Sequence, residues 1–140
     1  MNRALAATVA LIGLGIATYL TIVHYTGAAP ACAIAHGCET VQKSSYSKLA
    51  GIPVALLGGL AYLAILATLT RTSEAARTAT ALLAVVGLAF SAYLTFIEVV
   101  VLHAICIWCV GSAICMLILA ALTTTSWLRS DPLPQPVTAR

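Results

Sequence analysis

Two pairs of cysteines are the residues in this chain best suited to chemistry. Cys106 and Cys109 form a Cys-x-x-Cys motif, and Cys32 and Cys38 enclose five residues earlier in the chain. On a helix, residues three positions apart lie on one face, so Cys106 and Cys109 can close a disulfide. The N–H groups at a helix N-terminus also favour a thiolate over a thiol. We therefore predict that this motif is a redox pair.

The loop pair, Cys32 and Cys38, can form a disulfide and, with Gly37 between them, can also move. Thiol–disulfide exchange between the loop pair and the helix pair would then relay electrons between a soluble partner and the membrane. Two alternatives stay open. The loop pair can be a structural staple, or both pairs, with His36 or His103, can supply the four ligands of a zinc site. We favour the redox interpretation and predict no metal.

The composition requires a membrane to position these cysteines. Of 140 residues, 61% are hydrophobic and 8% are charged, whereas a soluble domain is about a quarter charged. The net charge of +3 is too small and too dispersed to indicate nucleic-acid binding. The fifth cysteine, Cys115, lies inside an apolar run and is expected to be an inert packing residue.

Four apolar runs are long enough to predict membrane-spanning helices. We expect an all-α, polytopic four-helix bundle over residues 1–128, with a long extracytoplasmic loop between the first two helices and a disordered cytoplasmic tail over residues 129–140. Residues 71–77 (RTSEAAR) are interpreted as a short polar turn. The first run is longer than the apolar core of a signal peptide, so we expect an uncleaved helix. The predicted helices cover approximately residues 4–25, 52–70, 79–102 and 104–125.

The orientation follows from the positive-inside rule, which places the side richer in Arg and Lys in the cytoplasm. Both termini should then be cytoplasmic, and all four paired cysteines should lie on the opposite, oxidising side. The arginines expected on the cytoplasmic side are Arg3, Arg71, Arg77, Arg129 and Arg140, against Lys43 and Lys48 on the other side.

Electrons that reach the helix pair need an acceptor. The chain has no glycine pattern for a dinucleotide, so a quinone in the bilayer is the natural two-electron acceptor, held in an apolar pocket between the helices. Trp108 is expected near the interface and is a candidate contact to the quinone ring. Glu98 is an acid within an apolar run, which is often functional. We expect it to reach water or lipid headgroups near its helix end, and we leave it outside the predicted site.

Several motifs together resemble the vitamin K epoxide reductase family in its bacterial form, from the first helix to the fourth. They are Cys32-x5-Cys38, Ser44 and Ser45, Tyr46 followed by residues 51–53 (GIP), and the motif at residues 106–109 (CIWC). The resemblance implies a four-helix bundle around a quinone of the ubiquinone, menaquinone or vitamin K type. It also implies oxidation of a thioredoxin-like partner, and so disulfide formation in exported proteins, at the bacterial inner membrane.

The resemblance also implies residue roles. Cys32 would face the partner, Cys38 would pass electrons to Cys106, Cys109 would face the quinone, and Ser44 would provide a hydroxyl at the site. Many bacterial members carry a fused thioredoxin-like domain, whereas this chain ends in a proline-rich tail, so we expect a separate partner. Animal members carry a tyrosine where this chain has Ala113, so we expect quinone reduction and not epoxide reduction.

Two functions from other classes remain as alternatives. A small four-helix multidrug transporter would fit the length, but it needs an acid deep in the first helix, and residues 4–25 contain none. A membrane anchor with structural disulfides would also fit the hydropathy. Neither alternative accounts for two cysteine pairs on one predicted face of the membrane.

Overall fold

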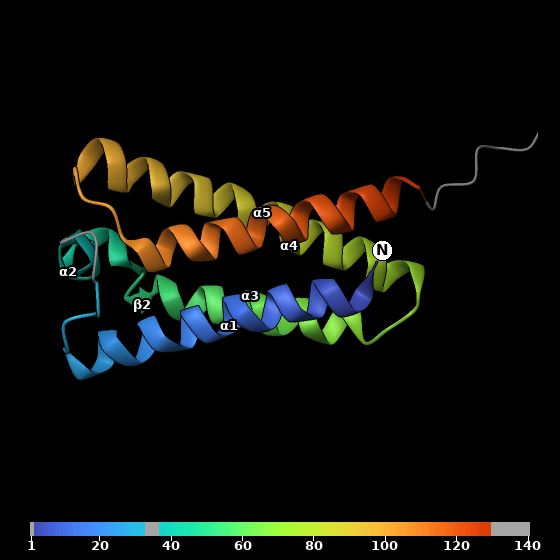
Figure 1. The fold of residues 1–140 in the computed structure, drawn as a ribbon, viewed down its shortest axis with the longest axis horizontal. Helices are drawn as coiled ribbons and strands as arrows, with labels where there is room; N and C mark the ends of the chain where they lie inside the picture. The colour runs from blue at the N-terminus through green and yellow to red at the C-terminus, as the bar shows by residue number, and fades with distance from the viewer. Residues whose placement is uncertain (1, 33–36, 130–140) are drawn as a thin grey trace, which may run out of the picture.

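Four long helices lie side by side in the computed structural model, which describes residues 2–32 and 37–129 (Figure 1). They are α1 (Arg3–Thr26), α3 (Val54–Leu69), α4 (Glu74–Phe96) and α5 (Ile107–Leu128). A π-helical turn, η2 (Ile97–Val101), continues α4. Helix α1 packs against α3 and α5, and α4 packs against α3 and α5, so the four helices enclose a common interior.

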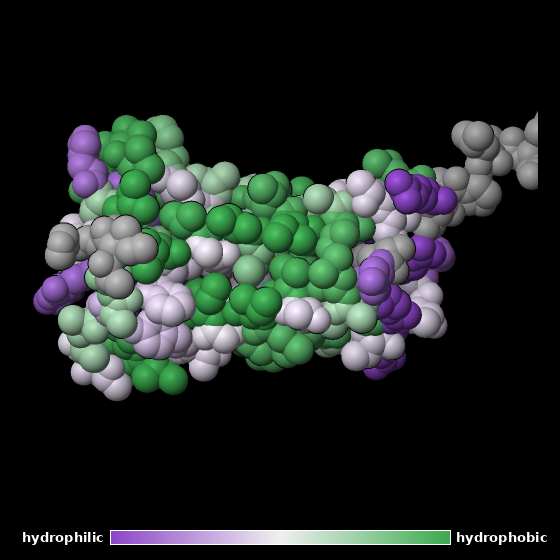
Figure 2. All heavy atoms as spheres, in the orientation of Figure 1, coloured by the Kyte–Doolittle hydropathy of each residue, from purple (hydrophilic) through white to green (hydrophobic). Residues whose placement is uncertain are grey.

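The surface is that of a helical membrane protein. Helices α1, α4 with its η2 extension, and α5 are long and apolar enough to cross a bilayer, whereas α3 is apolar but has only 16 residues. On the face that Figure 2 shows, hydrophobic residues cover the middle of the bundle and hydrophilic residues gather at its two ends. Large apolar side chains near the middle of α1 and α4, such as Leu11 and Val86, are exposed, as they are where lipid is the solvent.

A compact connection joins α1 to α3. Gly27, at a positive φ of 67°, ends α1. The connection then contains a short helix, α2 (Gly37–Lys43), a 3₁₀ turn, η1 (Ser45–Ser47), and a small hairpin of β1 (Lys48–Leu49) and β2 (Ile52–Pro53). The expected helix start near residue 52 therefore shifts to Val54, because residues 52–53 pair with β1 before the chain turns into the helix.

Two other helix starts differ from the sequence expectations. The polar turn expected over residues 71–77 is shorter than predicted, because α4 already begins at Glu74. The Ser73 hydroxyl caps this helix by accepting the N–H of Ala76 at 3.2 Å. Conversely, residues 102–106 are not helical, and α5 begins at Ile107 rather than near residue 104. His103 turns the chain with a positive φ of 49°. Arg129 follows the end of α5, and the rest of the expected tail lies outside the described residues.

The centre of the bundle is built around Tyr62 on α3, whose side chain is fully buried. Its ring lies directly over Gly13 of α1, where an added Cβ would stand only 2.2 Å from the ring carbon Cζ. Its hydroxyl donates to the backbone oxygen of Ser112 on α5 at 2.9 Å. Tyr62 therefore joins α1, α3 and α5 at one level, and only a glycine at position 13 permits this approach.

Candidate redox site

Helix α2, which carries Cys38, and the start of α5, which carries Cys106 and Cys109, lie at the end of the bundle opposite the N-terminus (Figure 1). Cys32 and Cys38 form a disulfide, and Cys106 and Cys109 are free thiols. A disulfide removes both loop sulfurs from any zinc coordination shell, which requires thiolates. Cys115 is buried in the hydrophobic core, away from this group.

Helix α2 presents an aqueous face at this end. Lys43 and Glu39 form an ion pair at 2.5 Å on its exposed side. The hydrogen bond from Lys43, together with its charge, lowers the pKa of Glu39 below its ordinary value. Both groups are therefore charged at neutral pH, so this face of α2 belongs in water and not in lipid.

The loop pair and the helix pair are brought together by a backbone contact. Gly37, the first residue of α2, lies so close to Ile105 that an added Cβ would stand 2.6 Å from its nitrogen and 2.7 Å from its oxygen. Gly37 directly precedes Cys38, and Ile105 directly precedes Cys106. Both cysteines are buried, with Cys38 1% exposed and Cys106 0% exposed. The approach of the two backbones thus places the loop disulfide against the start of α5.

Cys106 is the N-cap of α5. Its Sγ accepts the backbone N–H of Cys109 at 3.4 Å and also interacts with the Cys109 side chain. A sulfur at this position receives the N–H groups that the first turn leaves unpaired, which favours its thiolate form. The sequence expectation of two sulfurs in the first turns of a helix is refined here, because Cys106 caps the helix and Cys109 lies within its first turn.

Glu98, on the π-helical turn η2, reaches both cysteines. One oxygen of its carboxylate accepts the backbone N–H of Cys106 at 3.1 Å, and the carboxylate also interacts with the Cys109 side chain. Its backbone oxygen accepts the N–H of Ala104 at 3.0 Å. The expectation that Glu98 reaches water or headgroups is wrong, since its side chain folds inward onto the turn and the residue is only 4% exposed. The signal available in the sequence was an acid within an apolar run.

A cavity of about 340 Å³ opens between the helices beneath the connecting loop. That volume is in the range of small-molecule sites. Its walls are mainly apolar, with side chains such as Leu20, Phe90 and Met116, and Cys109 lies on its lining. An apolar chamber with a few polar groups and one thiol suits a quinone ring. The polar side chains that line it include Ser44, Tyr62, Glu98 and Ser112.

Of the sequence-predicted ring contacts, Cys109 and Ser44 line this cavity, whereas Trp108 is not among the described residues that do. The Trp108 ring packs on Tyr19 with centroids 4.8 Å apart, and its Nε1–H donates to the backbone oxygen of Ala31 at 2.9 Å. The Tyr19 hydroxyl accepts the N–H of Ala31 at 2.9 Å. Trp108 therefore fastens the segment just before Cys32 to the start of α5.

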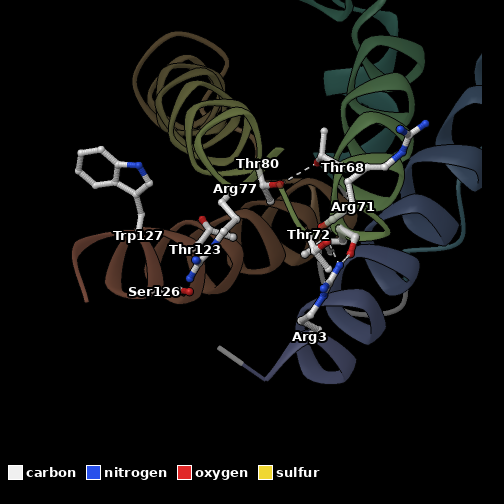
Figure 3. Close-up of a pocket in the computed structure, with 10 residues that line it drawn as sticks. Arg3, Thr68, Arg71, Thr72, Arg77, Thr80, Thr123, Ser126 and Trp127 are labelled. Carbon is white, nitrogen blue, oxygen red and sulfur yellow. Dashed lines mark hydrogen bonds between the residues drawn. The ribbon is translucent and has the colours of Figure 1, made fainter. Parts of the chain in front are cut away.

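A second cavity, of about 230 Å³, lies at the opposite end, where Arg3, Arg71 and Arg77 surround it (Figure 3). Arg3 donates to the backbone oxygens of Leu69 and Arg71, and Arg77 pairs with Glu74 at 3.1 Å. The bonds from Arg3 tie the start of α1 to the end of α3 and to the turn that follows it, whereas the pair of Arg77 and Glu74 lies within the first turn of α4. No described cysteine lines this cavity, so it is separate from the redox site.

Two comparisons with known proteins complete the description of the site. No curated protein matches the chain. The model of the vitamin K epoxide reductase family matches residues 4–124, which include both cysteine pairs, the connecting loop and most of α5. The chain therefore belongs to the vitamin K epoxide reductase family, a family of quinone-linked thiol oxidoreductases.

Proposed function

We propose that this protein oxidises the thiols of a separate thioredoxin-fold partner and reduces a membrane quinone, and so drives disulfide formation in exported proteins. The close packing of Gly37 on Ile105 carries the proposal, because it sets the loop disulfide against the helix thiols. A loop pair whose half-buried member, Cys32, can meet a water-side partner and a helix pair next to an apolar cavity are the two halves of an electron relay. The quinone would be of the ubiquinone, menaquinone or vitamin K type.

The relay proceeds by two thiol–disulfide exchanges. A thiolate of the partner attacks Cys32, and the partner leaves oxidised while Cys32 and Cys38 become thiols. Cys38 then attacks Cys106 of the oxidised helix pair, and Cys32 resolves the mixed disulfide. The structure, with a loop disulfide and two helix thiols, corresponds to the state in which both electrons have reached Cys106 and Cys109.

The division of labour within the helix pair is supported by burial. Cys106 is fully buried beneath the loop, whereas Cys109 lines the cavity. Closing the Cys106–Cys109 disulfide releases two electrons and two protons, which are what a quinone takes up to become a quinol. Ser44, Tyr62 and Ser112 would orient the ring from the cavity wall. Trp108 would act on the loop rather than on the ring, because its N–H is bonded to Ala31.

We further propose that all four long helices span the bacterial inner membrane, with both termini cytoplasmic and the cysteines extracytoplasmic. Helix α3 is about 24 Å long at 1.5 Å per residue, and the β1–β2 hairpin completes the crossing on the cysteine side. The positive-inside rule supports this orientation, since Arg3 and Arg71 meet at the end far from the cysteines.

The test is quinone reduction by the purified protein, followed optically, with either a reduced thioredoxin-fold protein or dithiothreitol as electron donor. Cys106→Ala and Cys109→Ala should abolish turnover with both donors. Cys32→Ala should abolish turnover with the protein donor but keep turnover with dithiothreitol, which can reduce the helix pair directly. Normal turnover in Cys109→Ala would refute the assignment of the quinone-facing thiol, and protein-driven turnover in Cys32→Ala would refute the relay order.

A further inference from the structure

Glu98 has no role in the relay described so far, although its position is costly. It is the one acid among the described residues that line the cavity, and no described Lys, Arg or His side chain lines the cavity with it. An acid buried in a membrane bundle without a basic partner is rare unless function requires it. The question is what its carboxylate does between Cys106 and Cys109.

The local geometry points to proton transfer with Cys109. The Oε2 atom of Glu98 accepts the Cys106 N–H at 3.1 Å, and each carboxylate oxygen retains acceptor capacity beyond one hydrogen bond. The carboxylate also interacts with the Cys109 side chain, which lines the same cavity. The bond to the backbone of Cys106 therefore holds the carboxylate in place beside the thiol that faces the cavity.

We propose that Glu98 is the general base that takes the proton from Sγ of Cys109 and then delivers it to the quinone oxygen. This inference rests on the proposed function. As the Cys106–Cys109 disulfide closes, two protons leave the sulfurs and two electrons leave with them. Glu98 carries the proton of Cys109, and the second proton, which Cys106 loses when it becomes a thiolate, reaches the quinone from water. The quinone receives both electrons and both protons, so the carboxylate ends each turnover ionised, as it began.

The other titratable groups near Glu98 are thiols and tyrosines, which are less suited than a carboxylate to accept the proton of Cys109. Cys106 and Cys109 face it from the start of α5, and the tyrosines on the cavity lining are Tyr62 of α3 and Tyr46 of the connecting loop. A tyrosine ordinarily has a pKa of about 10, so its hydroxyl is already protonated near neutral pH and is not available to accept a thiol proton. Among the described residues around the cavity, the Glu98 carboxylate is thus the group suited to accept a thiol proton.

A purely structural role for Glu98, in holding the turn before α5, makes a different prediction. Glu98→Gln keeps the size of the side chain and an oxygen that can accept the Cys106 N–H, but its amide cannot take up a proton. The bond from the Ala104 N–H goes to the backbone oxygen and is unaffected by the substitution. If Glu98 only holds the turn, this variant should behave like the wild type.

The first measurement needs no quinone. In a Cys115→Ala background, iodoacetamide labelling of Cys109 is quantified by mass spectrometry between about pH 5.5 and 7.5. Internal transfer of the proton to Glu98 makes part of the wild-type rate independent of pH. In Glu98→Gln the proton must leave to water, so the rate should rise about tenfold per pH unit. A wild-type rate that rises tenfold per unit throughout this range would overturn the proposal without any variant.

The second measurement is dithiothreitol-driven quinone reduction. Glu98→Gln should lower kcat by about 100-fold or more, the usual contribution of a general base, with KM for the quinone unchanged. Glu74→Gln is the matched control, because it removes an acid from the far end of α4, and it should leave kcat unchanged. Equal kcat values in Glu98→Gln and the wild type would overturn the role of Glu98. A wild type that reduces no quinone would instead refute the proposed function, while the labelling profile would still test Glu98.

Discussion

Replacing Gly37 by alanine should slow the transfer of electrons from the loop pair to the helix pair. Gly37 is the residue through which α2 rests on the backbone just before Cys106. Gly37 is the first residue of α2, so alanine fits its helical backbone conformation. The effect of the substitution should therefore come from the added methyl group and not from backbone strain.

The magnitude follows from the contact distances. The new Cβ would lie 2.6 Å from the nitrogen of Ile105, about 0.8 Å short of the 3.4 Å at which ordinary contact begins. The atoms that the new Cβ would meet, N and O of Ile105 and the carbonyl carbon of Ala104, all belong to the backbone, so α2 and Cys38 must move away as a unit. A misplacement of about 1 Å between reacting groups costs on the order of 100-fold in rate. We expect a fall of roughly 30- to 100-fold, equivalent to about 2–3 kcal/mol in the barrier.

The assay compares two electron donors. With a reduced thioredoxin-fold protein as donor, Gly37→Ala should show the full loss of quinone reduction. With dithiothreitol, which reduces Cys106 and Cys109 directly, it should match the wild type. Gly15→Ala is the matched control, since a Cβ at Gly15 meets nothing within 4 Å, and it should retain both rates.

Two results would refute this reasoning. Protein-driven turnover at the wild-type rate would show that the contact between Gly37 and Ile105 does not position the loop cysteines for transfer. An equal loss with both donors would show that the substitution damages the helix pair or the cavity rather than the approach of Cys38 to Cys106. Circular dichroism and the yield of folded protein accompany both assays.

Three further substitutions test the packing around the site. Gly13→Ala would place a Cβ 2.2 Å from the Tyr62 ring, and should lower the free energy of unfolding by about 1–3 kcal/mol, measured by thermal denaturation in detergent. An unchanged melting temperature would contradict this contact. Trp108→Phe removes the hydrogen bond to the Ala31 oxygen, worth about 1 kcal/mol, and should make the mildly reduced loop cysteines several-fold faster to alkylate. Unchanged alkylation would show that Trp108 does not hold the loop. Cys115→Ala should keep full turnover and lose about 1 kcal/mol of stability, because its thiol only packs in the core. Loss of turnover would mean that a third thiol takes part.

Much of the fold and part of the site could be predicted because their signals are local. The hydropathy of a run of residues and the spacing of cysteines do not depend on how helices pack, so the helical membrane class and the two pairs were accessible from the chain alone. The start of α4 also has a local signal, because Ser73 stands three residues before Ala76 as a helix cap. The membership of the chain in its family was likewise carried by short motifs, and the family match over residues 4–124 confirms it.

The functional geometry, in contrast, depends on contacts between residues far apart in the sequence. Gly37 meets Ile105, Tyr62 bonds to Ser112 across 50 positions, and Trp108 bonds to Ala31 across 77. Nothing in the local sequence of Trp108 shows that it faces the loop instead of the cavity. The sequence shows Glu98 as an unusual acid within an apolar run. Only the tertiary structure shows that its side chain turns inward, accepts the N–H of Cys106 and is buried beside the two thiols. Sequence determines which groups are present and which elements they form. Packing between those elements decides which groups meet.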